Sequence, residues 1–124
     1  MPVAIQPQNT QDIVLYEEDD LGRFSRDIVT IASGRWLPIG TVLGKRSDGK
    51  CAALDPAATD GSQLFYGVLL ADVDAFADKQ AAAIVRHAIV KRQGLRWPAG
   101  LDAAAIQAFE DAAQTHGILV RDAI

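Results

Sequence analysis

The residues able to do acid–base or nucleophilic chemistry are few, and they do not fall into a catalytic pattern. The sequence contains no HExxH, CxxC or Ser-His-Asp arrangement, and its glycines form neither GxGxxG nor a phosphate-binding loop with lysine. His87 alternates within an expected strand, and His116 lies at an expected helix end. We therefore expect structural roles for both histidines, and a hydrolase that uses one of them is the third of three hypotheses.

Three aspartates are spaced in a way that suggests a calcium loop. They are Asp72, Asp74 and Asp78. An EF-hand loop also needs a glycine at its sixth position and a glutamate at its twelfth, where this sequence has Ala77 and Ala83. We reject a calcium site at this position and predict no metal or other cofactor.

Composition and charge indicate one globular domain without a nucleic-acid partner. The 124 residues are 49% apolar and 23% charged, which is an ordinary balance for a single core. The net charge is −4 and the basic residues are scattered, whereas nucleic-acid binding needs a concentrated positive surface. Cys51 is the only cysteine, so it cannot form an internal disulfide or complete a zinc site.

The start of the chain and the length of its apolar runs argue against a membrane partner. Residues 1–11, MPVAIQPQNTQ, lack the basic and apolar regions of a signal peptide. No apolar run approaches the ~20 residues that a membrane-spanning helix needs. We expect the protein to be made and assembled in a cytoplasm.

Short apolar runs between turn signals predict a body made mostly of strands. Strands are expected within 25–34 and 118–124 and at 41–43, 51–54, 64–72 and 83–92. Asp48-Gly49 is a strong hairpin signal between two of them. For residues 74–83, local propensity favours a helix, and a loop with one helical turn is the alternative. The overall pattern is α+β.

One helix is expected within residues 101–117, in the C-terminal half. Asp102 is its expected N-cap and Gly117 its expected C′ residue. One face of this helix is apolar apart from its last residue. That face consists of Ala105, Ile106, Phe109, Ala112, Ala113 and His116.

The leading segment differs in composition from the body. Residues 1–12 are mostly polar and without period, so we expect them to be disordered in isolation. Ile13, Val14, Leu15 and Tyr16 form a run typical of a strand, and residues 17–20 are all acidic, which is typical of a solvated turn. This run is either an edge strand of the body or an arm that pairs with a partner's sheet edge.

The two tryptophans suggest packing or an interface. Trp36 and Trp97 could each belong to the core or anchor a subunit contact, where aromatic side chains concentrate binding energy. We favour core or subunit contact over ligand stacking.

Four segments, taken in order, resemble the head decoration protein family of lambda-type tailed phages. The most telling parts are the DG-x5-GVL pattern at Asp60–Leu69 and the paired glycines of GTVLG, neither of which is a catalytic signature. The resemblance covers residues 24–124 and depends on order and spacing. The segments are SRDIVTIASGRWLPIGTVLGK, LDPAATDGSQLFYGVLLADVDA, AIVRHAIVKRQGLRWPAGLD and HGILVRDAI.

The resemblance implies a non-enzymatic capsid protein. It implies a homotrimer of compact bodies, residues 25–124, each with a flexible N-terminal arm, residues 1–24, in a β-tadpole-like shape. Such trimers bind the major capsid protein at threefold and quasi-threefold positions outside the expanded head, and they stabilise it against the pressure of packaged DNA. The protein would lie on the virion surface after assembly in the cytoplasm of the bacterial host.

The resemblance also suggests which residues make contacts. Within the arm, Ile13–Tyr16 is the segment expected to pair with a capsid strand, although residues 13–20 are more apolar and more acidic here than in the lambda-like pattern. Phe24, Trp36, Trp97 and Pro98 are expected at a subunit or capsid interface.

The alternative function is a small β-barrel carrier or binding domain of an enzyme complex. Short strands bounded by glycines recur in such barrels. Lys50, which follows Asp48-Gly49, would be the lysine to be modified.

Overall fold

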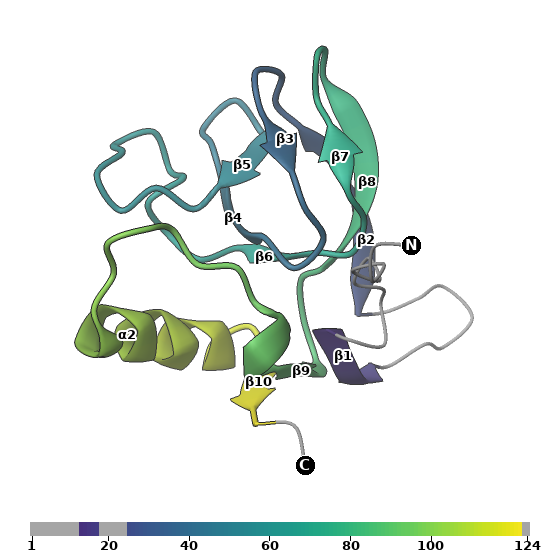
Figure 1. Ribbon diagram of the computed structural model, residues 1–124. Helices are drawn as coiled ribbons and strands as arrows, with labels where there is room; N and C mark the ends of the chain where they lie inside the picture. Colours follow the sequence, from purple (N-terminus) through teal and green to yellow (C-terminus); the bar gives the residue numbers. More distant parts are fainter. Residues whose placement is uncertain (1–12, 18–24, 123–124) are drawn as a thin grey trace, which may run out of the picture.

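The computed structural model describes residues 13–17 and 25–122 of the chain. A closed five-stranded barrel forms most of the body (Figure 1). A three-stranded sheet and one α-helix lie together at one end of the barrel, and a two-stranded ribbon lies at the other end. This arrangement confirms the expected α+β body, mostly β with one helix in the C-terminal half.

The barrel closes because its first and last strands pair along six residues. Its strand order is β2-β5-β4-β6-β8, and β8 returns to pair with β2 from Arg26↔Ile84 to Ile31↔Lys79. All neighbours are antiparallel except β2 and β5. The strands are β2 (Arg26–Ile31), β4 (Val42–Lys45), β5 (Cys51–Ala53), β6 (Gly67–Leu69) and β8 (Lys79–Ile84).

The other elements form the two ends of the molecule. In the three-stranded sheet, β9 is central and pairs antiparallel with β1 and parallel with β10. The bounds are β1 (Val14–Glu17), β9 (Ala88–Lys91) and β10 (Ile118–Arg121) for this sheet, β3 (Trp36–Leu37) and β7 (Val73–Asp74) for the ribbon, η1 (Arg92–Gly94) for a 3₁₀ turn and α2 (Ala103–Gln114) for the helix.

The barrel wall separates two hydrophobic cores. Because successive side chains of a strand point to opposite faces, Leu43 and Leu69 enter one core and their neighbours Val42 and Val68 enter the other. The second core includes Ala113 of α2, so it lies between the barrel and the end layer. All four strand residues are fully buried, and burying such a side chain stabilises the fold by about 1.5–3 kcal/mol.

The helix begins as expected. The side chain of Asp102 accepts a hydrogen bond from the Ala105 N–H at 2.8 Å, which satisfies one of the free donors of the first turn. At the other end the C-cap is Thr115, so His116 is the C′ residue and Gly117, with φ +77°, lies one position beyond it. The Asp102 N-cap is confirmed, and the helix ends one residue earlier than a C′ residue at Gly117 would place it.

The expectation of a helix or of a loop with one helical turn at 74–83 is wrong, and two expected strands are longer than the observed ones. Residues 79–84 form a strand and not a helix, because pairing with β2 outweighs the helix propensity of three alanines. The expected strand 83–92 is interrupted at His87, where φ is +49° and the carbonyl accepts a hydrogen bond from the Ser25 hydroxyl at 2.7 Å. The expected strand 64–72 contains regular pairing only at 67–69.

The β4–β5 connection confirms the hairpin predicted from Asp48-Gly49. The Arg46 N–H donates to the Lys50 carbonyl at 2.8 Å, and the Gly49 N–H donates back to the Arg46 carbonyl at 2.9 Å. Gly49 has φ +87°, a conformation that glycine adopts without a Cβ penalty.

Gly44 allows the loop after β5 to pass close to the barrel wall. A Cβ at this position would lie 2.3 Å from the carbonyl oxygen of Ser62 and 2.6 Å from its Cα. Both atoms belong to the backbone, so no side-chain rotation relieves the overlap.

We expect Gly44→Ala to destabilise the fold by about 1–3 kcal/mol, because the added methyl group must displace the Ser62 backbone. Urea unfolding of Gly44→Ala and of Ser47→Ala, an exposed turn residue, measures the difference. Equal midpoints for the two variants would contradict the close approach.

Candidate functional site

Three of the four predicted interface residues line one hollow in the body. Trp36, Trp97 and Pro98 come from distant parts of the sequence and border a space of about 830 Å³. Phe24, the fourth, lies outside the described residues. The tertiary structure therefore brings the two tryptophans to a common surface, which their positions in the sequence did not indicate.

Each tryptophan is positioned by a different contact. Trp36 lies opposite Asp74 in the β3–β7 ribbon, while the next pair, Leu37 and Val73, is buried. Alternation therefore turns Trp36 outward, where it is 57% exposed. Trp97 is half-buried and stacks on Phe109 of α2, with ring centroids 6.0 Å apart and an angle of 27° between the planes.

The segment that carries Trp97 is tied to β4 by its backbone. The Arg96 N–H donates to the Gly40 carbonyl at 2.8 Å, and the Val42 N–H donates to the Arg96 carbonyl at 3.2 Å. The Arg96 side chain also donates from Nε to the Ile39 carbonyl at 3.0 Å. These bonds hold one wall of the hollow in a fixed position.

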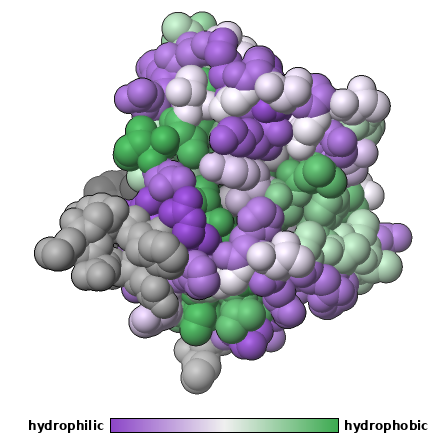
Figure 2. Space-filling view, turned by 180° about the vertical axis from the view of Figure 1, so that it is seen from behind, coloured by the Kyte–Doolittle hydropathy of each residue, from purple (hydrophilic) through white to green (hydrophobic). Residues whose placement is uncertain are grey.

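The hollow mixes apolar and charged groups in the manner of a binding surface. Proline and alanine side chains stand beside the exposed Arg35 and the carboxylates of Asp55 and Asp60. Seen from behind, the molecule carries its hydrophobic residues in separate patches between hydrophilic ones (Figure 2). Aromatic and arginine side chains with a polar surround are typical of contact surfaces between proteins.

The segment expected to pair with a partner lies on its own body in this structure. Ile13 is 0% exposed within the second core, and β1 pairs with β9 of the same chain. Leu15 and Tyr16 are 47% and 53% exposed. Of the two possibilities that the sequence left open, the structure shows the edge strand; pairing with a capsid strand stays a prediction.

The boundary of the expected arm at residue 24 also stays a prediction. Residues 1–12 and 18–24 lie outside the described residues, so residues 13–17 are the described part of the expected arm.

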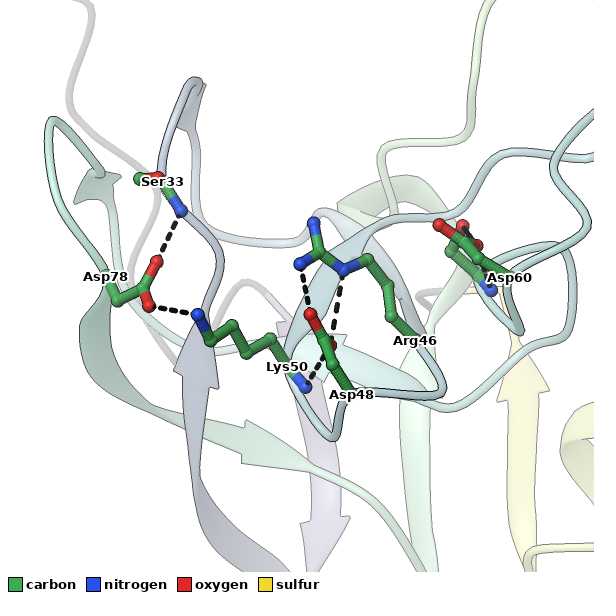
Figure 3. A network of polar contacts seen from close by, with 7 residues as sticks. Ser33, Arg46, Asp48, Lys50, Asp60 and Asp78 are labelled. Carbon is green, nitrogen blue, oxygen red and sulfur yellow. Dashed lines mark hydrogen bonds and ion pairs between the residues drawn. The ribbon is translucent and has the colours of Figure 1, made fainter.

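A network of ion pairs joins three loops at one rim of the barrel (Figure 3). Asp48 pairs with Arg46 and accepts a hydrogen bond from the Lys50 N–H at 3.0 Å. The Lys50 amine pairs with Asp78 at 2.6 Å, and Asp78 accepts the Ser33 N–H at 2.9 Å. The β4–β5, β2–β3 and β7–β8 connections are thereby linked.

These contacts stabilise the ionised carboxylates. The hydrogen bond from Arg46 is the largest cause that lowers the pKa of Asp48 from 3.8 to about 2. The hydrogen bond from Lys50, followed by that from the Ser33 N–H, lowers the pKa of Asp78. Both carboxylates are exposed, so the network is a set of surface ion pairs that links the three loops.

The remaining candidates for chemistry have structural contacts. The Lys50 amine pairs with Asp78 at the surface. The His87 N–H donates to the His116 carbonyl at 3.2 Å, and the His116 ring lies 6.0 Å from that of Phe65.

Among the described residues, the cysteine and the acidic side chains have structural surroundings. Burial raises the pKa of the Cys51 thiol to about 11, so the thiol is protonated and unreactive at neutral pH. Asp72 accepts the Ile39 N–H at 2.7 Å. In the described part of the chain, no group of three or more His, Cys, Asp or Glu side chains is placed to hold a metal ion.

Within residues 13–17 and 25–122, no helix has the length and apolar character needed to cross a membrane.

The ion pair of the buried Glu110 was not expected from the sequence. Glu110 is buried on α2 and accepts hydrogen bonds from Arg92 of η1 at 3.0 and 3.2 Å, and Arg92 also pairs with Asp122 at 2.6 Å. A signal was present, because Glu110 falls four residues after Ile106 and three before Ala113 on the apolar face.

A comparison with protein families gives one match. The model of a family described as HDPD, bacteriophage lambda head decoration protein D, matches residues 3–118. That range includes the barrel, the helix and the whole hollow. No curated protein matches the chain.

We expect Asp48→Asn to be less stable than the unchanged protein at pH 7, and the difference to shrink as the pH falls. A carboxylate whose pKa is lowered on folding contributes stability above its unfolded pKa of 3.8, and this contribution is lost as the pH falls towards about 2. Thermal unfolding between pH 7 and pH 2 measures the difference. Asp74→Asn, at an exposed residue of β7, controls for the change in net charge. A difference in unfolding temperature that stays constant between pH 7 and pH 2 would argue against a stabilising role of the Asp48 ion pair.

Proposed function

This chain belongs to the bacteriophage lambda head decoration protein D family, and we propose from that premise that it binds the expanded phage head as a homotrimer. The family consists of structural capsid proteins and not enzymes. The single observation that carries the proposal is the family match, which spans most of the chain. The partner is the major capsid protein, at threefold and quasi-threefold positions on the outer surface.

The proposed role is to brace the head against the pressure of packaged DNA. Such a role requires a body that resists deformation, and a closed barrel with a core on each side of its wall supports this requirement. The protein is assembled in the bacterial cytoplasm, acts on the virion surface, and uses neither catalysis nor a cofactor.

A trimer would bring three leading segments to one capsid site. Once one segment of residues 1–24 is bound, the other two are held near their own acceptors. Linked binding of this kind strengthens attachment by ~10²–10⁴-fold without any new type of contact. Weak individual contacts between the leading segment and the major capsid protein are then sufficient.

The hollow supports the proposed self-association. An exposed tryptophan beside a second tryptophan and a proline is the kind of surface that anchors a subunit contact. We assign Trp36, Trp97 and Pro98 to the interface between neighbouring subunits.

The carrier alternative has one observation in its favour, the closed barrel. The family match counts against it, because the matched family is one of phage head decoration proteins.

Cosedimentation with shells of the cognate major capsid protein tests the proposed function. We expect the full-length chain to pellet with expanded shells and to stay in solution with unexpanded ones, because only the expanded lattice offers the acceptor. Light scattering of the free and shell-released protein should show trimers. Failure to bind expanded shells, or a strictly monomeric bound species, would overturn the proposal.

Trp36→Ala should weaken self-association by about tenfold or more, because it removes an exposed aromatic anchor from the hollow. The trimer dissociation constant is measured by sedimentation over a dilution series. Leu64→Ala is the matched control, since Leu64 is also apolar and 64% exposed but does not line the hollow. An equal effect of both substitutions would remove the hollow from the interface.

A further inference from the structure

We propose that β1 remains paired with β9 when the protein binds the capsid, and that the side chains of Leu15 and Tyr16 form the contact with the major capsid protein. The inference rests on the proposed function and makes it more specific. Its alternative is strand exchange, in which the segment leaves the body and pairs with a capsid strand through its backbone.

Ile13 anchors the start of β1 in the core. Its side chain is 0% exposed and belongs to the cluster that also contains Val90 and Ile118. The Ile13 Cδ1 atom would lie 3.0 Å from a Cβ built on Gly40, so this glycine leaves just enough space for the isoleucine. Strand exchange would expose Ile13 and leave a cavity, which costs both transfer free energy and packing.

Glu17 anchors the other end of β1. Its two carboxylate oxygens accept hydrogen bonds from Arg26 of β2, from Nε at 2.6 Å and from Nη2 at 2.5 Å. Both side chains are mostly buried, at 19% and 23% exposure, so water screens this bidentate pair only in part. β1 is thus fastened to the body at both ends.

The strand between these anchors presents side chains outward and has an irregular edge. Val14 pairs with Val90 and Tyr16 with Ile89, so one extra residue on β1 interrupts the register between them. This irregularity leaves Leu15 and Tyr16, two consecutive residues, both exposed. Strand irregularities of this kind redirect side chains and protect sheet edges from pairing with a further strand.

The position of β1 in the sequence identifies its partner. Residues 1–12 precede Ile13 directly, so a capsid protein that holds the leading segment also lies beside Leu15 and Tyr16. The two exposed apolar side chains directly precede Glu17 on β1, so an apolar pair is followed along the strand by a charged pair. Neither residue lines the hollow assigned to neighbouring subunits, so both contacts can form at once.

A disulfide across β1 and β9 tests whether the strand stays in place. Val14 and Val90 are directly paired, and Val14→Cys with Val90→Cys in a Cys51→Ala background permits one crosslink. Intact mass and thiol titration identify the oxidised and reduced forms of the double variant. Cosedimentation with expanded shells then compares the binding of the two forms. Equal binding within about threefold supports the inference, whereas a loss of tenfold or more that reduction reverses would establish strand exchange.

Side-chain substitution gives a second, independent test. Leu15→Ser with Tyr16→Ser keeps the strand and its anchors, so we expect an unchanged unfolding temperature and binding weakened by tenfold or more. Ile28→Ser, at an exposed apolar residue on β2, is the matched control. Unaltered binding by the double variant would overturn the inference. If the unmodified protein fails to bind expanded shells, the proposed function fails instead, so the two failures are distinguishable.

Discussion

The structure depends on one constraint: the barrel wall must be covered on its inner face and on its outer face. Strands β4, β6 and β8 contribute alternate residues to a core inside the barrel and to a core beneath it. A wall that is apolar on both sides leaves little room for charged or nucleophilic groups. The polar side chains are accordingly concentrated at rims, edges and connections, and binding must occur there.

The two-sided wall also requires backbones to approach closely. Gly44 lets the loop at Ser62 lie against β4. A Cβ added at Gly67 would lie only 2.4 Å from the carbonyl oxygen of Ile84. The GTVLG and DG-x5-GVL patterns therefore mark contacts between chain segments and not a ligand site.

Three peripheral features remain for function, and two of them share Arg46, which lines the hollow and also pairs with Asp48. The hollow presents aromatic side chains, β1 presents Leu15 and Tyr16, and the ion pairs around Asp48 hold loops at the rim together. In our interpretation the hollow joins subunits, β1 contacts the capsid protein, and the ion pairs keep the body rigid.

Local sequence alone determined the first barrel strand, the Asp48-Gly49 hairpin and the helix capped by Asp102, because alternation, turn chemistry and capping act over a few residues. Only the tertiary structure decided that 79–84 is a strand, that Glu110 is buried against Arg92, and that β1 lies on its own body. It also brought Trp36 to the same hollow as Trp97. Each of these outcomes depends on partners distant in the sequence, whose pairing and burial outweigh local preference.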